Sequence, residues 1–212
     1  MSSRQGRSPI FTVFAGPNGA GKSTLTPQYQ LGPKIDSDAI QRSLSPSSEL
    51  LAAKETLRLL DLYKQQGRSF SWETTLSSNH AVNEIATAKA MGYDVRVYFV
   101  VLDSAQQSQD RVEIRVSQGG HAIPTGTIAR RFEKIFEHAI MVAPAVDRFS
   151  LIDNHRGGFV RLLHIVANDI KLRAASESPR INTAINDIVQ AVELTRKTGH
   201  DLDLDLDCEP EV

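Results

Sequence analysis

The chain has 212 residues, of which 41% are hydrophobic and 23% charged, and its formal net charge at pH 7 is −1. This composition is typical of a globular domain with one core, and no overall basic field favours a nucleic-acid partner. The single cysteine, Cys208, excludes a disulfide framework within the chain and fits a reducing compartment.

Neither a secretory leader nor a membrane span is predicted. The first residues, MSSRQGRSPIF, are polar and lack the apolar centre of a signal peptide. No apolar run approaches the ~20 residues that a membrane-spanning helix needs. We therefore expect a cytoplasmic protein that has neither a membrane nor a nucleic acid as partner.

Strands and helices alternate in the first half of the chain. Residues 9–15, PIFTVFA, have the apolar, β-branched and aromatic composition of a buried strand. A helix is expected to begin inside GKSTLTPQYQ and to end before Gly32, and the short segment KIDSD at 34–38 predicts a second strand. The next predicted elements are a helix at 48–67, a strand at 68–75 and a helix at 79–92.

The second half continues this alternation. Residues 94–102, DVRVYFVVL, form the strongest strand pattern in the sequence. Pro144 predicts a break in the helical stretch before the late strands. The remaining predictions are a helix at 104–118, helices over 125–147, strands at 148–154 and 158–166, and a helical region at 168–198 interrupted near Pro179. The domain is thus expected to span 9–198, between a disordered segment at 1–8 and an acidic tail at 199–212.

Alternating strands and helices predict an α/β fold with a mainly parallel sheet and helices on both faces. In such sheets ligands bind at the carboxyl ends of the strands. Polar residues do follow the predicted strands: glycines after the first, Asp36 and Asp38 after the second, Glu73 to Thr75 after the third, and Asp153 with Asn154 after the fifth. We therefore expect these residues to gather at one edge of the sheet.

The segment FAGPNGAGKSTL matches the G-x-x-x-x-G-K-[ST] phosphate loop in the required strand–loop–helix setting. Its glycines let backbone N–H groups approach phosphate oxygens, and the following helix directs the positive end of its dipole at the same anion. Lys22 is expected to reach the β- and γ-phosphates, and Ser23 to ligate Mg²⁺. A tight turn without a ligand is disfavoured, because pattern and context agree. The predicted nucleotide contacts are Gly16, Pro17, Asn18, Gly19, Ala20, Gly21, Lys22, Ser23 and Thr24.

The phosphate loop alone does not choose between classes of nucleotide-binding protein. A GTPase should carry an NKxD-type guanine reader and a transport ATPase an LSGGQ-like signature, and the sequence has neither. The strand YFVVLD ends in Asp103, which partly imitates the acidic strand end of a transport ATPase. The alternative is that Asp103 caps the helix beginning at 104.

Carboxylates after the second and third strands are candidates for the acceptor side. Phosphoryl transfer to a hydroxyl needs a carboxylate that accepts its proton, and Asp36 or Asp38 can serve while the other caps the next helix. Spacing alone favours Asp38 as the cap. Glu73 can bind substrate or hold the water shell of Mg²⁺, and Thr74 or Thr75 can bond substrate or phosphate. The alternative is a merely polar strand end. Trp72 is expected to pack in the core.

Basic side chains concentrate in residues 110–138, on two helices joined by SQGGHAIPTG. These helices predict a lid whose arginines close on the phosphates, stabilise transferred charge and exclude water. The alternative is a solvated surface on which the arginines pair with Glu113 and Glu133. The residues concerned are Arg111, Arg115, Arg130, Arg131 and Lys134.

Together these segments resemble the zeta toxin family of kinases. The matching pieces lie within residues 10–166 and read AGPNGAGKST, IDSD, ETT, GYDVRVYFVVLDS, RVEIRVSQGGHAIPTGTIARRF and LIDN. The chain looks closest to the short chromosomal zeta-like proteins, often labelled predicted ABC-type ATPases. The resemblance implies a P-loop NTPase fold and a cytoplasmic kinase that uses ATP and Mg²⁺ on a UDP-sugar, in the best-known members UDP-N-acetylglucosamine. It also implies a possible antitoxin protein, acting in trans.

The resemblance also assigns roles to residues. It places the catalytic base on Asp38, which outranks the capping role suggested by spacing, and substrate contacts on Glu73 and Thr75. The other implied residues are Lys22, Arg115 and Arg131 on the transferring phosphate, Asp36 and Thr74 near the substrate, and Asp153 and Asn154 near the adenine. The chain is shorter than the plasmid-encoded toxins, so kinase chemistry is implied more firmly than the UDP-sugar. An ATP-binding regulatory or ABC-type ATPase without an acceptor is the competing hypothesis.

Overall fold

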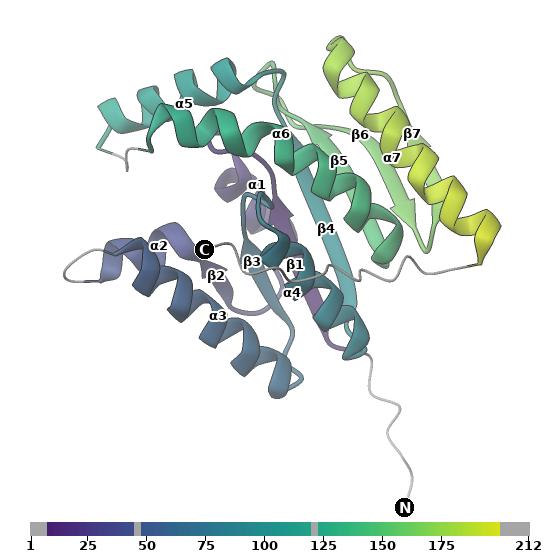
Figure 1. Ribbon diagram of the computed structural model, residues 1–212, viewed down its shortest axis with the longest axis horizontal. Helices are drawn as coiled ribbons and strands as arrows, with labels where there is room; N and C mark the ends of the chain where they lie inside the picture. Colours follow the sequence, from purple (N-terminus) through teal and green to yellow (C-terminus); the bar gives the residue numbers. More distant parts are fainter. Residues whose placement is uncertain (1–7, 45–47, 120–122, 200–212) are drawn as a thin grey trace, which may run out of the picture.

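Seven strands form one sheet in the computed structural model, which describes residues 8–44, 48–119 and 123–199 (Figure 1). In chain order they are β1 (Ile10–Ala15), β2 (Lys34–Asp36), β3 (Phe70–Glu73), β4 (Asp94–Val101), β5 (Arg148–Asp153), β6 (Val160–Val166) and β7 (Asp169–Arg173). Their spatial order is β2-β3-β1-β4-β5-β6-β7, in which the first five are parallel to one another and β6 is antiparallel to both of its neighbours, β5 and β7. The predicted α/β fold with a mainly parallel sheet is confirmed.

Helices cover both faces of this sheet. They are α1 (Lys22–Tyr29), α2 (Ser37–Ser43), α3 (Glu49–Gln65), α4 (Asn79–Ala90), α5 (Ala105–Ser117), α6 (Thr125–Val142) and α7 (Pro179–Thr198), with a 3₁₀ turn η1 (Ala143–Ala145) after α6. In Figure 1, α4, α6 and α7 lie in front of the sheet and α1 lies behind it. The break expected at Pro144 is the 3₁₀ turn. Within the described ranges, no helix is both long and apolar enough to cross a membrane.

The core extends over both faces of the sheet, because its cluster of buried residues includes Leu25 of α1 as well as residues of the front helices. β1 lies inside the sheet between β3 and β4, and helices cover both faces of the sheet. Residues on both faces of β1 are therefore buried, and its apolar run is unbroken. Phe11 packs against Phe70 at a ring distance of 4.5 Å and stacks on Trp72 at 6.3 Å. Burial of each such side chain contributes about 1.5–3 kcal/mol. Trp72 therefore packs in the core, as predicted.

The structure differs from the predicted helical region at 168–198. Residues 169–173 form β7, which pairs with β6 as a hairpin, and α7 begins only at Pro179. Ala167 and Asn168 in the connecting turn have positive φ values of 48° and 60°, and asparagine adopts this conformation more readily than most residues. Ser178 then caps α7 by accepting the N–H of Ile181. Local turn chemistry thus overrides the helical pattern.

Candidate active site

The glycine-rich loop joins the end of β1 to the start of α1. Gly16, Gly19 and Gly21 have φ values of 136°, 74° and 87°, a region that residues with a side chain rarely enter. A Cβ atom on Gly16 would lie 2.1 Å from the carbonyl oxygen of Val100, so the close approach to β4 also requires glycine. Gly21 precedes α1 without a side-chain cap in the described structure. The first N–H groups of α1 are therefore available to an anion.

Lys22 folds back over this loop. Its Nζ donates hydrogen bonds of 2.9 Å to the carbonyl oxygens of Gly16 and of Pro17, and its side chain is buried. Burial lowers the pKa of Lys22, against the opposing effect of the carboxylates of Glu73 and Asp38. The ammonium group thus lies where phosphate oxygens could replace two neutral carbonyl acceptors.

Two buried side chains hold the loop from other elements. The Asn154 amide, after β5, donates to the carbonyl oxygen of Ala20 at 2.8 Å. The Ser108 hydroxyl, on α5, donates to the carbonyl oxygen of Asn18 at 2.6 Å. Neither contact was predicted from the sequence, because each joins segments about a hundred residues apart; Asn154 was expected near the adenine, and Ser108 belongs to no recognisable motif. The loop is therefore braced from the sheet and from the first lid helix.

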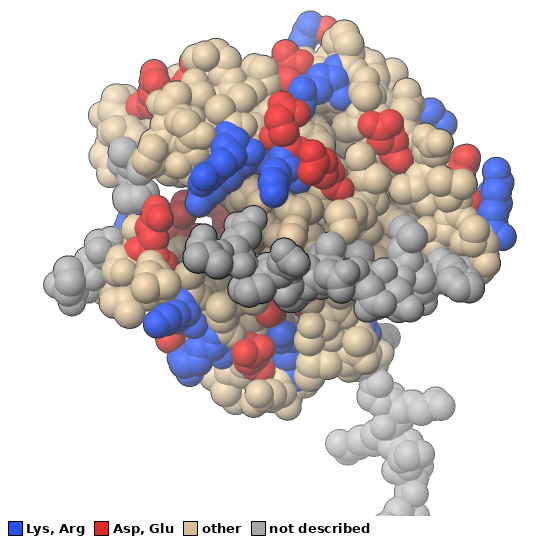
Figure 2. Space-filling model, in the orientation of Figure 1, with Lys and Arg blue, Asp and Glu red and all other residues tan. Residues whose placement is uncertain are grey.

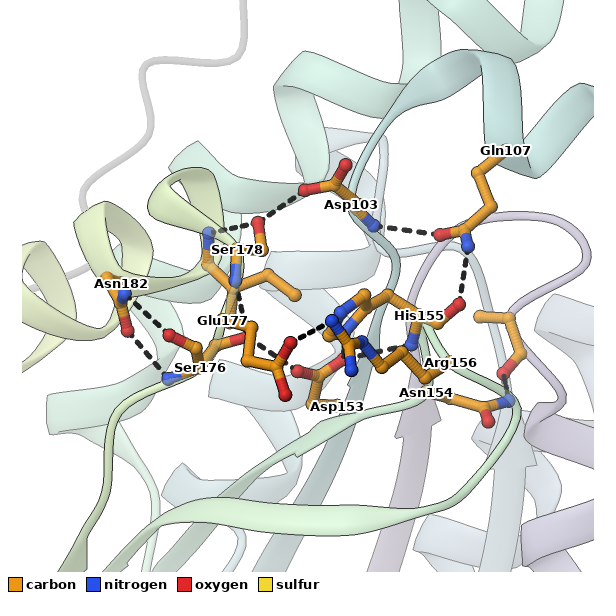
Figure 3. A network of polar contacts seen from close by, with 12 residues as sticks. Asp103, Gln107, Asp153, Asn154, His155, Arg156, Ser176, Glu177, Ser178 and Asn182 are labelled. Carbon is orange, nitrogen blue, oxygen red and sulfur yellow. Dashed lines mark hydrogen bonds and ion pairs between the residues drawn. The ribbon is translucent and has the colours of Figure 1, made fainter.

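A polar network surrounds this brace (Figure 3). The Asp153 carboxylate accepts from the backbone N–H of His155 at 2.9 Å, from the ring Nδ1 of His155 at 2.7 Å and from the Ser176 hydroxyl at 2.7 Å. The Gln107 amide donates to the carbonyl oxygen of His155 at 2.5 Å, which ties α5 to the end of β5. Asp153 is therefore a buried anchor in this arrangement, and a contact to adenine stays a prediction.

The capping role considered for Asp103 is wrong. Ser104 caps α5, because its hydroxyl accepts the N–H of Gln107 at 3.1 Å. The Asp103 carboxylate instead accepts the hydroxyl of Ser178 at the start of α7 (Figure 3). Asp103 thus links the carboxyl end of β4 to the start of α7.

Ser23 and Glu73 meet beside the loop. The Ser23 hydroxyl donates to Oε1 of Glu73 at 2.8 Å, because the pairing of β1 with β3 brings the carboxyl ends of both strands together. Lys34 lies between Glu73 and Asp36, with Nζ 3.5 Å and 3.0 Å from their carboxylates. Lys34 was not predicted as a site residue, although its i, i+2 spacing from Asp36 puts both on one face of a strand. A hydroxyl and a carboxylate are the oxygen ligands that Mg²⁺ prefers, so these residues fit that ion.

Asp36 caps α2, so the expectation from spacing that Asp38 is the cap is wrong. Oδ1 of Asp36 accepts the N–H of Ala39 at 3.1 Å. Burial alone would raise the pKa of Asp36, but the hydrogen bonds from Lys34 and Ala39 outweigh it, and the pKa is lowered. The prediction failed because β2 ends at Asp36 and α2 begins at Ser37, one residue before Asp38. Both Asp36 oxygens have partners within the protein, and a substrate contact stays a prediction.

Asp38 lies in the first turn of α2, half-buried. It forms no hydrogen bond or ion pair with another residue in the described ranges, and its charge acts on the pKa of Lys22.

The next turn along the sheet edge carries Thr74 and Thr75. The Thr74 hydroxyl accepts the N–H of Leu76 at 3.2 Å, and the Thr75 hydroxyl lies 2.8 Å from that of Ser77. Substrate contacts of both threonines remain predictions.

The arginines of the predicted lid differ in their surroundings. Arg111 donates to the carbonyl oxygens of Asn154 and His155 at 2.6 and 3.2 Å, so it is fixed beside the loop, and burial lowers its pKa. Arg115, one turn further along α5, lies close enough to lower the pKa of Lys22. Arg131 on α6 makes no ion pair with a described residue.

Other parts of the lid prediction have different outcomes. Glu133, considered as a partner of the lid arginines, instead forms an ion pair with Arg180 of α7 at 2.5 Å. The middle of the connecting segment, residues 120–122, lies outside the described residues. Figure 2 shows Lys and Arg interspersed with Asp and Glu on the face in view, without one continuous basic area.

Fold and site together define a P-loop phosphotransferase: a glycine-rich loop with its lysine and serine joins a strand to a helix at the carboxyl edge of a mainly parallel sheet. The model of the zeta toxin family matches residues 51–157, about half of the chain, and the protein belongs to this family. The match begins after the phosphate loop, so the family assignment and the loop motif are separate observations.

Known proteins agree with this assignment at the level of fold. An uncharacterized protein of Haemophilus influenzae is 30% identical over 125 residues, which are 56% of this chain and 89% of that protein. The crystal structure of the AvrRxo1-ORF1:-ORF2 complex with ATP has a TM-score of 0.65 at 12% identity, over 89% of this chain and 77% of that chain. The structure from the PezAT toxin–antitoxin system of Streptococcus pneumoniae has a TM-score of 0.55 at 14% identity, over 92% of this chain and 90% of that chain.

Proposed function

We propose that the protein is a cytoplasmic kinase that transfers the γ-phosphoryl group of ATP to a hydroxyl of a UDP-sugar, with UDP-N-acetylglucosamine as the first candidate. The observation that carries this proposal is the meeting of Ser23 and Glu73 beside Lys22, with the Asp38 carboxylate within electrostatic reach. Such an arrangement provides a phosphate site and a proton acceptor on the same strand edge. A regulatory ATPase would need only the first.

On the donor side, loop N–H groups and Lys22 would bind the β- and γ-phosphates. Ser23 and Glu73 would hold Mg²⁺ directly or through water, and the ion supplies positive charge that offsets the charge of the phosphates. Arg115 and Arg131 are proposed to neutralise the transferring group when the lid closes, which fits the proximity of Arg115 to Lys22.

On the acceptor side, Asp38 would accept the proton of the attacking hydroxyl. The new bond joins that oxygen to the γ-phosphorus while the bond from phosphorus to the bridging oxygen of ADP breaks, so charge and atoms balance. Asp36, Glu73, Thr74 and Thr75 border the same edge and are proposed to position the acceptor. Support for Asp38 is the absence of a competing hydrogen bond or ion pair among the described residues.

Asn154 is proposed to contribute to the adenine side. Its Nδ2 holds the phosphate loop, whereas its buried Oδ1 has no hydrogen-bond partner in the described part of the structure. A buried acceptor without a partner is costly, and a donor group of the nucleotide could satisfy it. Asp153 would act indirectly, by fixing the backbone around Asn154.

The proposed reaction is tested by incubating the protein with ATP, MgCl₂ and single UDP-sugars, followed by mass spectrometry of the sugar nucleotides. A phosphorylated UDP-sugar, with ADP in equal amount, is the expected result. ADP without a phosphorylated acceptor across the panel would favour the ATPase alternative. Absence of any ATP turnover, with folded protein, would refute both.

We further propose that an antitoxin protein acts on this chain in trans. Support comes from the family, and from the PezAT toxin–antitoxin system and the AvrRxo1 complex, whose chains share the fold. Induced expression in a bacterial host should arrest growth, and the Asp38→Asn chain at equal abundance should not. Normal growth with active wild-type chain would contradict a toxic role.

A further inference from the structure

A buried histidine connects the second lid helix to the turn after β3. His138 of α6 is 4% exposed, and its Nδ1 lies 2.8 Å from the carbonyl oxygen of Leu76. Its Nε2 lies 3.1 Å from Oδ1 of Asn79 at the start of α4. Because a backbone carbonyl oxygen only accepts hydrogen bonds, Nδ1 carries the proton that points at Leu76. In that ring form Nε2 is an acceptor, so the Asn79 amide meets it through its NH₂ group, with the amide oxygen and nitrogen exchanged.

Leu76 is held in an unfavourable backbone conformation. Its φ is 59°, in the left-handed region, and its side chain is fully buried. This conformation is unfavourable for a residue with a Cβ atom, so surrounding contacts must maintain it. The hydrogen bond from His138 is one such contact, and the bond from the Leu76 N–H to the Thr74 hydroxyl is another.

Residues 74–78, here named the acceptor turn, are therefore fixed at three points. The N–H of Thr74 donates to the carbonyl oxygen of Phe14 at 3.0 Å, His138 holds Leu76, and Ser78 caps α4. Thr75, a proposed substrate contact, lies between the first two points. A shift of the Leu76 carbonyl would therefore move Thr75.

The same helix carries a proposed phosphate clamp. Arg131 precedes His138 by seven residues on α6, which is about two turns, so both side chains leave the helix on nearly the same side. One end of this rigid segment thus bears Arg131 and the other is bonded to the acceptor turn. Because the helix is rigid, a displacement of the acceptor turn also displaces Arg131, and a displacement of Arg131 also displaces the acceptor turn.

We propose that His138 is a positioning residue that couples the acceptor turn to the lid helix α6. It sets the Leu76 carbonyl and hence Thr75, and it transmits the state of the acceptor turn along α6 to Arg131. The inference rests on the proposed kinase function, but its structural half concerns only the described residues.

Two amide substitutions separate the two hydrogen bonds of the ring. In His138→Asn the side-chain amide falls near the position of Nδ1 and can still donate to Leu76, whereas in His138→Gln it falls near Nε2 and can reach only Asn79. We expect His138→Gln to raise the KM for the acceptor about tenfold, with the KM for ATP unchanged, and His138→Asn to stay close to wild type. Equal effects of both variants, or a change in KM for ATP alone, would overturn the proposal.

A second measurement is made on the wild-type chain and needs no acceptor substrate. Nitrogen NMR of the wild-type chain should show the Nδ1–H form of His138, and the Leu76 amide should exchange slowly. Where His138→Gln folds, this exchange should accelerate, and it should not in His138→Asn. The opposite ring form, or rapid exchange in wild type, would refute the coupling. If the UDP-sugar panel gives no product while these results hold, the proposed acceptor is wrong and the role of His138 in the turn stands.

Discussion

At the phosphate loop, the buried ammonium group of Lys22 donates hydrogen bonds to two carbonyl oxygens of its own loop in place of water. Replacement by alanine removes the charge aimed at the phosphates and relieves the burial of an ammonium group. We expect Lys22→Ala to lower kcat at least about 100-fold without loss of thermal stability. Product formation and the melting temperature are the measurements. A melting temperature well below wild type would show instead that the Lys22 bonds hold the loop.

Asp38 offers the sharpest test of the acceptor side. Asp38→Asn keeps the shape of the side chain but cannot accept a proton, so ATP affinity should stay within about twofold and kcat should fall by about 10²–10⁴-fold. Calorimetry with ATP and magnesium measures the affinity, and mass spectrometry of the product over time measures kcat. Asp187→Asn, on the exposed surface of α7, is the matched control and should be silent. Retained turnover in Asp38→Asn would remove this residue from the role of base.

Asp36 is expected to contribute to acid stability. Its pKa in the folded chain lies below the ordinary value of 3.8, so its stabilising effect is complete above that value and is lost as the pH falls through the lower folded value. Asp36→Asn should flatten the fall of the unfolding free energy in that window. Asparagine is also a good helix cap, so the loss near pH 7 should be small. Urea unfolding between pH 2 and about 7 measures this, and parallel curves for both chains would contradict it.

At the scale of elements, α5 is fastened to the phosphate loop through the Ser108 hydroxyl. Ser108→Ala leaves the Asn18 carbonyl without this donor, so we expect a loss of about 1–3 kcal/mol in unfolding free energy and a several-fold weaker affinity for ATP. Ser117→Ala, at the exposed end of the same helix, loses only a bond to Ile114 and serves as control. Equal effects of the two variants would argue against a brace.

Helices and strands with a clear pattern of apolar residues were predictable from the sequence, whereas turns and contacts between distant segments were not. β1, α3 and β4 follow directly from apolar periodicity, and the phosphate loop from its glycine spacing. The hairpin of β6 and β7 was missed, because two residues with positive φ decide it. Within the site, the carboxylates were predicted as a group. The choice of Asp36 as cap depended on where β2 ends, and element boundaries are set by tertiary pairing.

At the scale of the whole molecule, α7 ends at a glycine C-cap. Gly199 closes α7 with a φ of 63° and donates its N–H to the carbonyl oxygen of Thr195. We propose that residues 9–198 form the kinase domain, so a chain ending after Gly199 should melt within about 2 °C of the full chain and keep its turnover. Calorimetry and product assays measure both. A large drop in melting temperature would place part of the domain beyond α7.

The bracing of the phosphate loop has a consequence for how the protein is made. Translation makes the loop motif first, and the Asn154 amide that holds its Ala20 carbonyl follows 134 residues later. At about 5–20 residues per second, roughly 7–27 seconds separate the two events. During synthesis there is therefore a period in which the phosphate-loop motif has been made but the hydrogen bond from Asn154 that holds the loop in place cannot yet form.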